Sequence, residues 1–167
     1  MLLRPAALLL ACALLPAPPT VTPAAEAFER LKMLAGQWTG TGADGTTSHY
    51  SYEVVAGGSA LLERCEMPHD GVPVTMLTLF TLDGSRLLLT HYCMAGNQPR
   101  MQARSFNPDS GELEFQFLDA TNLAAGAGHM HGARFRLIDN NHFSSEWDFY
   151  ENGQRKFAET AQYTRVR

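Results

Sequence analysis

The chain has 167 residues, of which 13 are Lys or Arg and 17 are Asp or Glu, so its net charge is −4 with the histidines neutral. No cluster of Lys or Arg occurs in it. An acidic chain without a basic patch lacks the electrostatic footprint of a protein that binds nucleic acid or an anionic membrane. The length fits one domain behind a short N-terminal segment.

That N-terminal segment, residues 1–24, is predicted to be a cleaved signal peptide. Arg4 precedes an apolar run over residues 5–15, which is too short to cross a bilayer because a span needs roughly 20 apolar residues. A charged start, a short apolar region and small residues afterwards are typical of a secretory signal, with cleavage after Ala24 or Ala27. An alternative makes Cys12 the lipidated cysteine of a bacterial lipoprotein. Both interpretations predict an exported protein, either free in the periplasm or outside the cell, or anchored through Cys12.

The first element of the remaining domain, residues 25–167, is predicted to be a short helix that begins near Ala24. Phe28, Leu31 and Leu34 recur at helical spacing, and Gly36 follows as a typical helix end. Beyond Gly36 the helical period is lost, and short alternating runs rich in Val, Thr, Tyr, Phe and Leu take over.

These runs predict about ten strands, separated by turns that contain Gly, Asn, Asp and Pro. The predicted strands are residues 37–43, 49–56, 59–67, 74–83, 86–94, 100–106, 112–119, 129–138, 142–151 and 155–166. Short connections make successive strands antiparallel neighbours. The predicted fold is therefore all-β, a single antiparallel up-and-down barrel of about ten strands with a short N-terminal helix.

Two residues at the ends of the domain add a more specific pattern. The first strand carries Gly36-Gln37-Trp38, and the last strand ends with Arg165. This resembles the calycin pattern of lipocalins and related barrels, in which an arginine of the last strand lies over the tryptophan of the first. The resemblance implies a structural lock between Trp38 and Arg165, made by a cation–π contact worth about 0.5–2 kcal/mol.

The domain also resembles a family of uncharacterised exported bacterial barrels. The stretches that carry this resemblance are Thr-His-Tyr-Cys at 90–93, Gly-Asn-Gln-Pro-Arg at 96–100 and His-Met-His at 129–131. It implies the fold rather than an activity. A more distant resemblance is to nitrobindin-type haem barrels, whose haem-ligating histidine lies near the C-terminus. This chain departs from that pattern because it has no histidine after His142.

Side chains alternate across a strand, so the apolar positions predict which face points into the barrel. On residues 129–138, His129 and His131 share a face with Ala133, Phe135 and Leu137. His91 and Cys93 share a face with Leu87 and Leu89, and Glu63 and Cys65 share one with Leu61 and Met67. Two further faces are also predicted to point inward. They are the face of residues 142–151 that holds Trp147 and the face of residues 155–166 that holds Glu159.

The up-and-down order then predicts where these residues lie along the barrel axis. His91 and Cys93 end one strand and His129 and His131 begin another, so all four are expected at the same open end. Trp38 and Arg165 are expected at the opposite, closed end. Asn97, Gln98 and Arg100 would act at the mouth, which the loop at 120–128 would also border.

The same order predicts that Cys65 and Cys93 are free. One strand separates them, so their backbones would be about 9–10 Å apart. A disulfide needs Cα atoms within roughly 7 Å.

Several chemistries fit the polar residues of the predicted mouth. His91, Cys93, His129 and His131 are of the type that binds zinc. Cys93 could act as a nucleophile with a histidine base, and Glu63 with Glu159 could form an acid–base pair. The simpler alternative pairs these two carboxylates with Arg64 or Arg100. Trp147, Phe149, Phe115, Phe117, Tyr50 and Tyr52 would line an apolar cavity or fill the core.

The function predicted from the sequence is binding of a small, partly apolar molecule inside an exported barrel. The expected binding residues are His91, Cys93, Asn97, Gln98, Arg100, His129, His131, Trp147 and Glu63. The alternatives are an enzyme or metalloprotein that uses the His and Cys cluster, with zinc or haem as the cofactor, and a structural envelope protein whose interior is filled by its own side chains.

Overall fold

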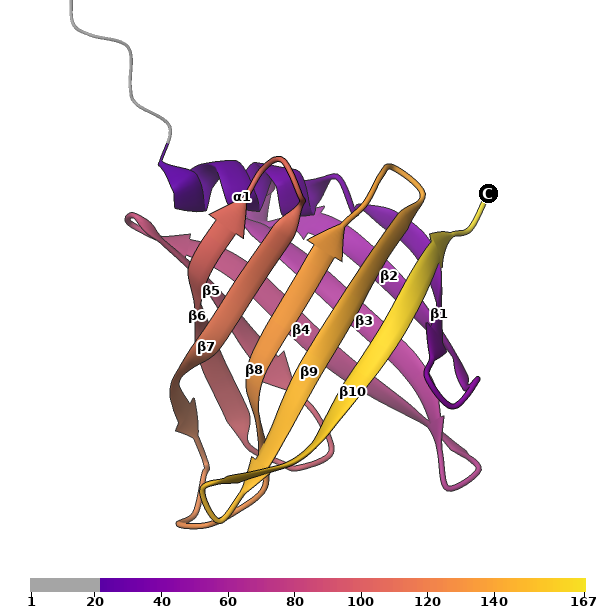
Figure 1. Cartoon of the computed structure of the whole chain (residues 1–167), viewed down its shortest axis with the longest axis vertical. Coiled ribbons are helices and arrows are strands. Elements are labelled where there is room, and N and C mark those ends of the chain that lie inside the picture. The colour runs from indigo at the N-terminus through magenta and orange to yellow at the C-terminus, as the bar shows by residue number, and fades with distance from the viewer. Residues whose placement is uncertain (1–21) are drawn as a thin grey trace, which may run out of the picture.

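A closed barrel of ten antiparallel strands makes up nearly all of the structure, a computed structural model that describes residues 22–167 (Figure 1). Cys12 and residues 1–21 of the predicted signal peptide lie outside the described residues. Each strand pairs with its neighbours in the chain, and β1 closes the barrel by pairing with β10. The elements are α1 (Pro23–Lys32), β1 (Gly36–Gly42), β2 (Thr47–Val55), the 3-10 turn η1 (Ala56–Gly58), β3 (Ala60–His69), β4 (Val72–Asp83), β5 (Arg86–Tyr92), β6 (Gln98–Asn107), β7 (Glu112–Thr121), β8 (His129–Leu137), β9 (His142–Glu151) and β10 (Gln154–Arg165).

This architecture confirms the predicted fold class. The strand bounds differ from the predicted ones by no more than two residues, because the Gly, Asn and Asp positions that stop each run do form the turns. A closed ten-stranded barrel fits the calycin-like architecture. Within residues 22–167, no helix is long and apolar enough to cross a membrane.

Helix α1 lies across one end of the barrel and closes it (Figure 1). The Thr22 hydroxyl caps its first turn by accepting a hydrogen bond from the Ala25 amide at 3.2 Å, and Pro23 occupies the first helical position. Ala27, Phe28 and Leu31 face the barrel and are fully buried. The helix therefore contributes three buried side chains to the hydrophobic core and covers the core at this end of the barrel.

The predicted lock lies beside the helix at this closed end. The Arg165 guanidinium carbon is 4.2 Å from the centre of the Trp38 ring. Arg165 also donates to the carbonyl oxygens of Met33, Ala35 and Asn140, and the Trp38 indole N–H donates to the Leu34 carbonyl at 2.7 Å. The arginine thus joins the end of α1, the first strand and the β8–β9 turn.

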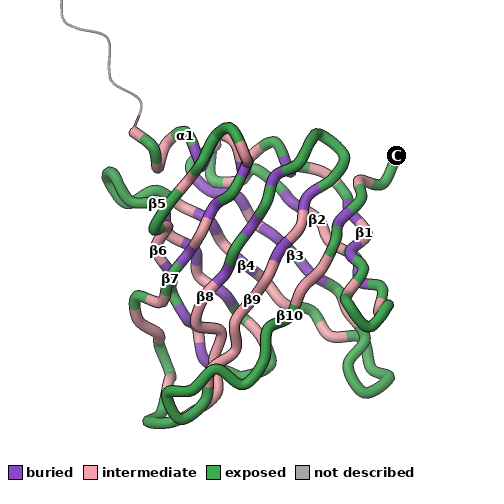
Figure 2. Tube along the Cα trace, viewed as in Figure 1, coloured by how far each residue is buried: buried purple, intermediate pink, exposed green. Residues whose placement is uncertain are grey.

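Buried side chains are concentrated in the half of the barrel near α1 and thin out towards the opposite end (Figure 2). Phe80, Phe115 and Phe135 form an aromatic layer there, with ring centres 5.8–6.0 Å apart. The opposite end has no helix over it within the described residues. Its connections are the turns at 43–46, 70–71 and 152–153 and the longer loops at 93–97 and 122–128.

Candidate functional site

A small cavity of about 40 Å³ lies inside the open half of the barrel, and we call it the inner cavity. Strands β2, β3, β4, β5, β8, β9 and β10 each contribute to it. Its lining residues are Tyr50, Glu63, Cys65, Met76, His91, Met130, Ser145, Trp147, Glu159, Ala161 and Tyr163. The wall therefore combines aromatic rings with a carboxylate-rich polar surface.

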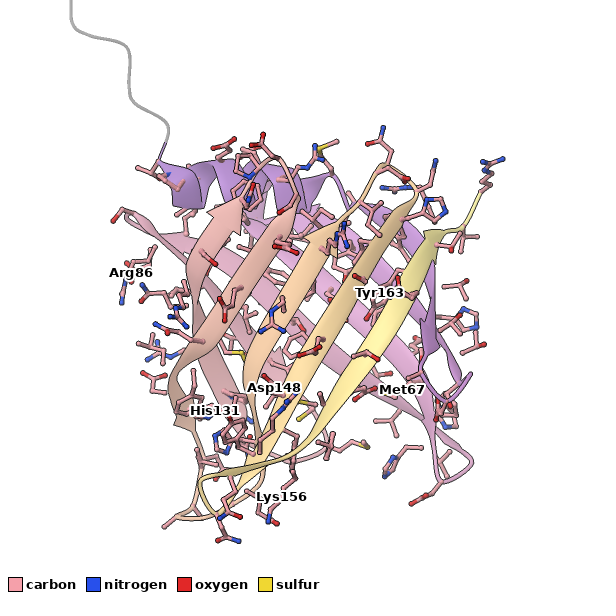
Figure 3. The ribbon with its side chains drawn as sticks, in the orientation of Figure 1. Met67, Arg86, His131, Asp148, Lys156 and Tyr163 are labelled. Carbon is pink, nitrogen blue, oxygen red and sulfur yellow. The ribbon has the colours of Figure 1, made fainter. Side chains whose placement is uncertain are left out.

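A second, larger cavity of about 390 Å³, the mouth cavity, is bounded by the ends of β1, β2, β3 and β10. It shares Tyr50, Glu159 and Ala161 with the inner cavity, so the two adjoin. Met67 and Phe157 supply apolar surface to the mouth cavity, and Met67 lies towards the open end of β3 (Figure 3).

A chain of hydrogen bonds runs through the wall of the inner cavity. The Tyr52 hydroxyl donates to Glu63 Oε2 at 2.5 Å, and the Thr78 hydroxyl donates to Glu63 Oε1 at 3.0 Å. Thr78 Oγ1 lies 3.0 Å from His91 Nδ1. All four side chains are buried.

This chain determines which nitrogen of His91 carries the proton. A threonine hydroxyl has one proton, so while Glu63 is ionised and can only accept, Thr78 accepts from His91 Nδ1–H. Burial lowers the pKa of His91 from 6.5 to about 4, so the ring is neutral at pH 7. With Glu63 ionised, His91 Nε2 carries no proton, and this buried atom has no hydrogen-bond partner among the described residues.

The two carboxylates of the inner cavity are not paired with the arginines expected for them. Arg64 pairs with Glu66, and Arg100 pairs with Asp119 on the outer wall. The predicted ion pairs of Glu63 and Glu159 are therefore wrong. Burial raises the pKa of both carboxyls, and Asp44 adds to the effect on Glu159. Glu159 is exposed to solvent at the mouth, whereas Glu63 is buried.

Tyr163 and Ser145 complete the polar wall, with their hydroxyl oxygens 2.8 Å apart. Tyr50 packs edge-on against Tyr163, with ring centres 4.8 Å apart. Cys65 lines the same wall, and burial raises the pKa of its thiol to about 12. Trp147 lies 4.9 Å from the His91 ring and lines the cavity, as predicted.

His129 and His131 do not line the inner cavity, contrary to the prediction. A register shift between Met130 and Gly132 places one extra residue in β8, and Met130 takes the inward position. A β-bulge of this kind reverses the side-chain alternation beyond it. The face assigned to Ala133, Phe135 and Leu137 is correct because these residues lie on the far side of the bulge.

The two histidines instead belong to an aromatic cluster where β7 and β8 separate. The two strands pair only over Glu112–Gln116, although β7 continues to Thr121. His131 stacks on Phe117 at 4.7 Å and on Tyr150 at 4.2 Å, and His129 Nε2 lies 3.0 Å from His131 Nδ1. Figure 3 shows His131 at this lower edge of the barrel.

The structure therefore does not bring His91 together with His129 and His131. Within residues 22–167, no three His, Cys, Asp or Glu side chains lie close enough together to hold a metal ion. The alternative that His91, Cys93, His129 and His131 share one zinc ion is wrong. The inner cavity also does not fit a haem, because a porphyrin is far larger than 40 Å³.

The remaining predicted residues lie around the open end but outside both cavities. Asn97 is buried and joins two loops by donating to the Gly128 carbonyl at 2.9 Å. Gln98 accepts from the Thr121 hydroxyl at 2.6 Å. Arg100 is exposed on the outer wall with Asp119, so its predicted place at the mouth is wrong. Cys93 is half-buried, and burial raises the pKa of its thiol.

Both cysteines in the described part of the chain are free, which confirms that Cys65 and Cys93 form no disulfide. Thr78 is the residue of the hydrogen-bond chain that sequence reasoning missed. Thr78 lies two residues before Phe80 on β4, so the two side chains share a face. This spacing would have placed Thr78 inward. Its hydrogen bond to His91 could not be read from the sequence because the partners come from different strands.

No protein-family profile matches the sequence, and no curated protein matches it. Among solved structures, a protein of unknown function from the DUF3598 family of Nostoc punctiforme has 13% identity and a TM-score of 0.49, over 80% of this chain and 48% of that one. The chain thus spans about half the length of that protein. The structure of EF1p2_mFAP2b bound to DFHBI has 13% identity and a TM-score of 0.40, over 84% of this chain and 99% of that one. Similarity at this level carries no argument about function.

Proposed function

We propose that the protein binds a small molecule, without reacting with it, in the inner cavity and the adjoining mouth cavity. The observation that carries the proposal is His91 Nε2, a buried ring nitrogen without a hydrogen-bond partner among the described residues, which acts as an acceptor while Glu63 is ionised. Leaving such a group unsatisfied costs about 1–3 kcal/mol, so native structures nearly always supply a partner. A donor group of a bound molecule would fill this role.

The two cavities differ in size, and the difference indicates how such a molecule would lie. The inner cavity holds a group of a few heavy atoms, since a water needs at least about 10–15 Å³ of the same kind of volume. The mouth cavity is about ten times larger and has an apolar side formed by Met67 and Phe157. A ligand with a small polar head and a larger, partly apolar body matches both.

The titration of two cavity residues, His91 and Cys65, argues against their use as a base or a nucleophile at pH 7. A general base works best when its pKa is near the operating pH, and His91 has a pKa of about 4. The Cys65 thiol, with a pKa of about 12, is not a thiolate at pH 7 and so is a poor nucleophile. Cys93 lies outside both cavities.

Export is part of the proposal and rests on the N-terminal sequence. The charged and apolar start of residues 1–24 supports a signal peptide, or a lipoprotein signal that ends at Cys12. Intact mass measurement of the protein from cell fractions tests this. A full-length mass in the cytoplasm would contradict export.

The test of binding uses His91→Phe, which keeps a ring against Trp147 but removes both nitrogens. We expect ligand-observed NMR with a fragment set of alcohols, phenols and amines to find binders of the wild-type protein. These binders should lose at least about tenfold in affinity for His91→Phe, since they lose a buried hydrogen bond.

His142→Phe is the matched control, because His142 is exposed at the closed end, beside Asp139. It should bind every fragment as the wild type does. Equal affinities of the wild type and His91→Phe for all binders would contradict the proposed site.

A further inference from the structure

Every Asp, Glu, Lys or Arg side chain that lines the two cavities is acidic, and His69 also lines the mouth cavity. Glu63 and Glu159 line the inner cavity, and Asp44 and Glu159 line the mouth cavity. Among the described residues, no Lys or Arg lines either cavity. The interior therefore repels anions such as carboxylates and attracts cations.

Three arginines of the barrel form ion pairs with other carboxylates. Arg64 pairs with Glu66, Arg100 with Asp119, and Arg155 with Asp148 at 2.6 Å. Within residues 22–167, neither Glu63 nor Glu159 has a basic side chain within 4 Å. Glu63 is buried, and a buried carboxylate without a cation is costly, so a positively charged ligand would offset that cost.

Aromatic faces add to the same preference. Tyr50, Trp147 and Tyr163 all line the inner cavity, and Tyr50 and Glu159 border both cavities. The face of a tyrosine or tryptophan ring attracts a cation by about 0.5–2 kcal/mol. His91 lines the same wall, and with Glu63 ionised its unpartnered Nε2 can accept one N–H or O–H donor.

We propose that the ligand is a small organic amine in its protonated form, with the ammonium group in the inner cavity and the carbon body in the mouth cavity. This inference rests on the proposed function. One ammonium N–H donates to His91 Nε2, and the charge lies among Glu159, Tyr50 and Trp147. The apolar body contacts Met67 and Phe157.

Three probes of nearly equal size and shape test the charge preference: phenethylamine, 2-phenylethanol and 3-phenylpropionate. Their affinities for the full chain are measured at pH 7.5 by ligand-observed NMR titration. We expect the amine to bind at least about tenfold more tightly than the alcohol. The carboxylate should bind most weakly.

Glu159→Gln removes one negative charge with little change of shape at an accessible position. It should weaken amine binding several-fold and leave the alcohol unchanged. Glu53→Gln removes the same charge from an exposed site outside both cavities and should change neither affinity. The pair separates a contact at the site from a change in net charge.

The outcomes distinguish the two proposals. If the alcohol or the carboxylate binds as tightly as the amine and depends on His91, the cavity binds small molecules but the amine inference is overturned. If amine affinity is the same in Glu159→Gln as in Glu53→Gln, the inference is also overturned. If none of the probes binds, both the amine inference and the proposed site are contradicted.

Discussion

The two ends of the barrel differ in how their polar groups are satisfied. At the closed end, the Trp38 indole N–H and the Arg165 guanidinium donate to four backbone carbonyls. At the open end, the His91 ring is positioned by Thr78 on one side, and its other nitrogen has no partner within the described residues. Hydrogen bonds thus hold the closed end together, whereas at the open end one buried ring nitrogen of His91 is left without a partner among the described residues.

The comparison predicts that substitutions at the two ends have opposite signatures. Changes at the closed end should lower the free energy of unfolding and leave binding intact in the molecules that remain folded. Changes at the open end should weaken binding with little effect on stability at pH 7. Four measurements sharpen this contrast.

The largest expected effect is from Trp38→Ala. Trp38 is 1% exposed, so the variant should lose about 3–5 kcal/mol of unfolding free energy through the cavity it leaves. Trp147→Ala removes the same side chain from a half-buried wall and should lose about 1–2 kcal/mol. Urea denaturation of both measures the difference. Equal losses would contradict the contrast between a packed end and an open one.

The next effect is a pH dependence that belongs to His91. The unfolded chain takes up a proton at this residue below about pH 6.5, but the folded chain does so only near pH 4. Its contribution to stability is therefore complete above pH 6.5 and is lost as the pH falls to 4, by about 3 kcal/mol. The raised pKa of Glu63 acts in the opposite sense, because a folded state that binds the proton more readily is stabilised at lower pH.

The difference between wild type and His91→Phe separates these two contributions. The unfolding free energy of the wild type should fall relative to that of the variant between pH 6.5 and 4, because only the wild type carries the imidazole. Parallel pH profiles would show that His91 has an ordinary pKa in the folded protein.

Arg165→Lys should have a smaller effect, a loss of about 1–2 kcal/mol in unfolding free energy. A lysine ammonium cannot contact Trp38 and three separate carbonyls with the planar geometry of the guanidinium. Arg167→Lys, on the exposed C-terminal residue, serves as the control in the same urea titration. If the two variants were equally stable, the lock would contribute nothing measurable.

The smallest effect is the stability change of His91→Phe at pH 7, expected within about 1 kcal/mol of zero. The variant loses the bond from Nδ1 to Thr78, but it also removes the unpartnered Nε2, and these effects offset each other. Thermal denaturation at pH 7 measures it. A loss as large as that of Trp38→Ala would mean that His91 is a structural residue of the core.

The closed end was predictable from the sequence because local signals determine it. The resemblance to the calycin pattern implied the contact between Trp38 and Arg165, and the strand order placed both residues at the closed end. The inward face of β3 was also predictable, because Leu61, Glu63 and Cys65 alternate without interruption.

The open end was less predictable because irregular strands control it. One extra residue between Met130 and Gly132 removes His129 and His131 from the cavity wall. A further register shift follows Arg100, which faces Asp119 outside the barrel. No residue pattern marks either shift, since a bulge depends on how neighbouring strands pair.

The hydrogen-bond chain from Tyr52 to His91 links the protonation of Glu63 to the kind of group that His91 can bind. If Glu63 takes up a proton on Oε1, that proton points to Thr78, the Thr78 hydroxyl turns towards His91 Nδ1, and the imidazole proton moves to Nε2. The nitrogen facing the ligand then donates where it had accepted. Protonation of Glu63, which the ligand need not touch, would thus change the group that the cavity selects from a hydrogen-bond donor to a hydrogen-bond acceptor.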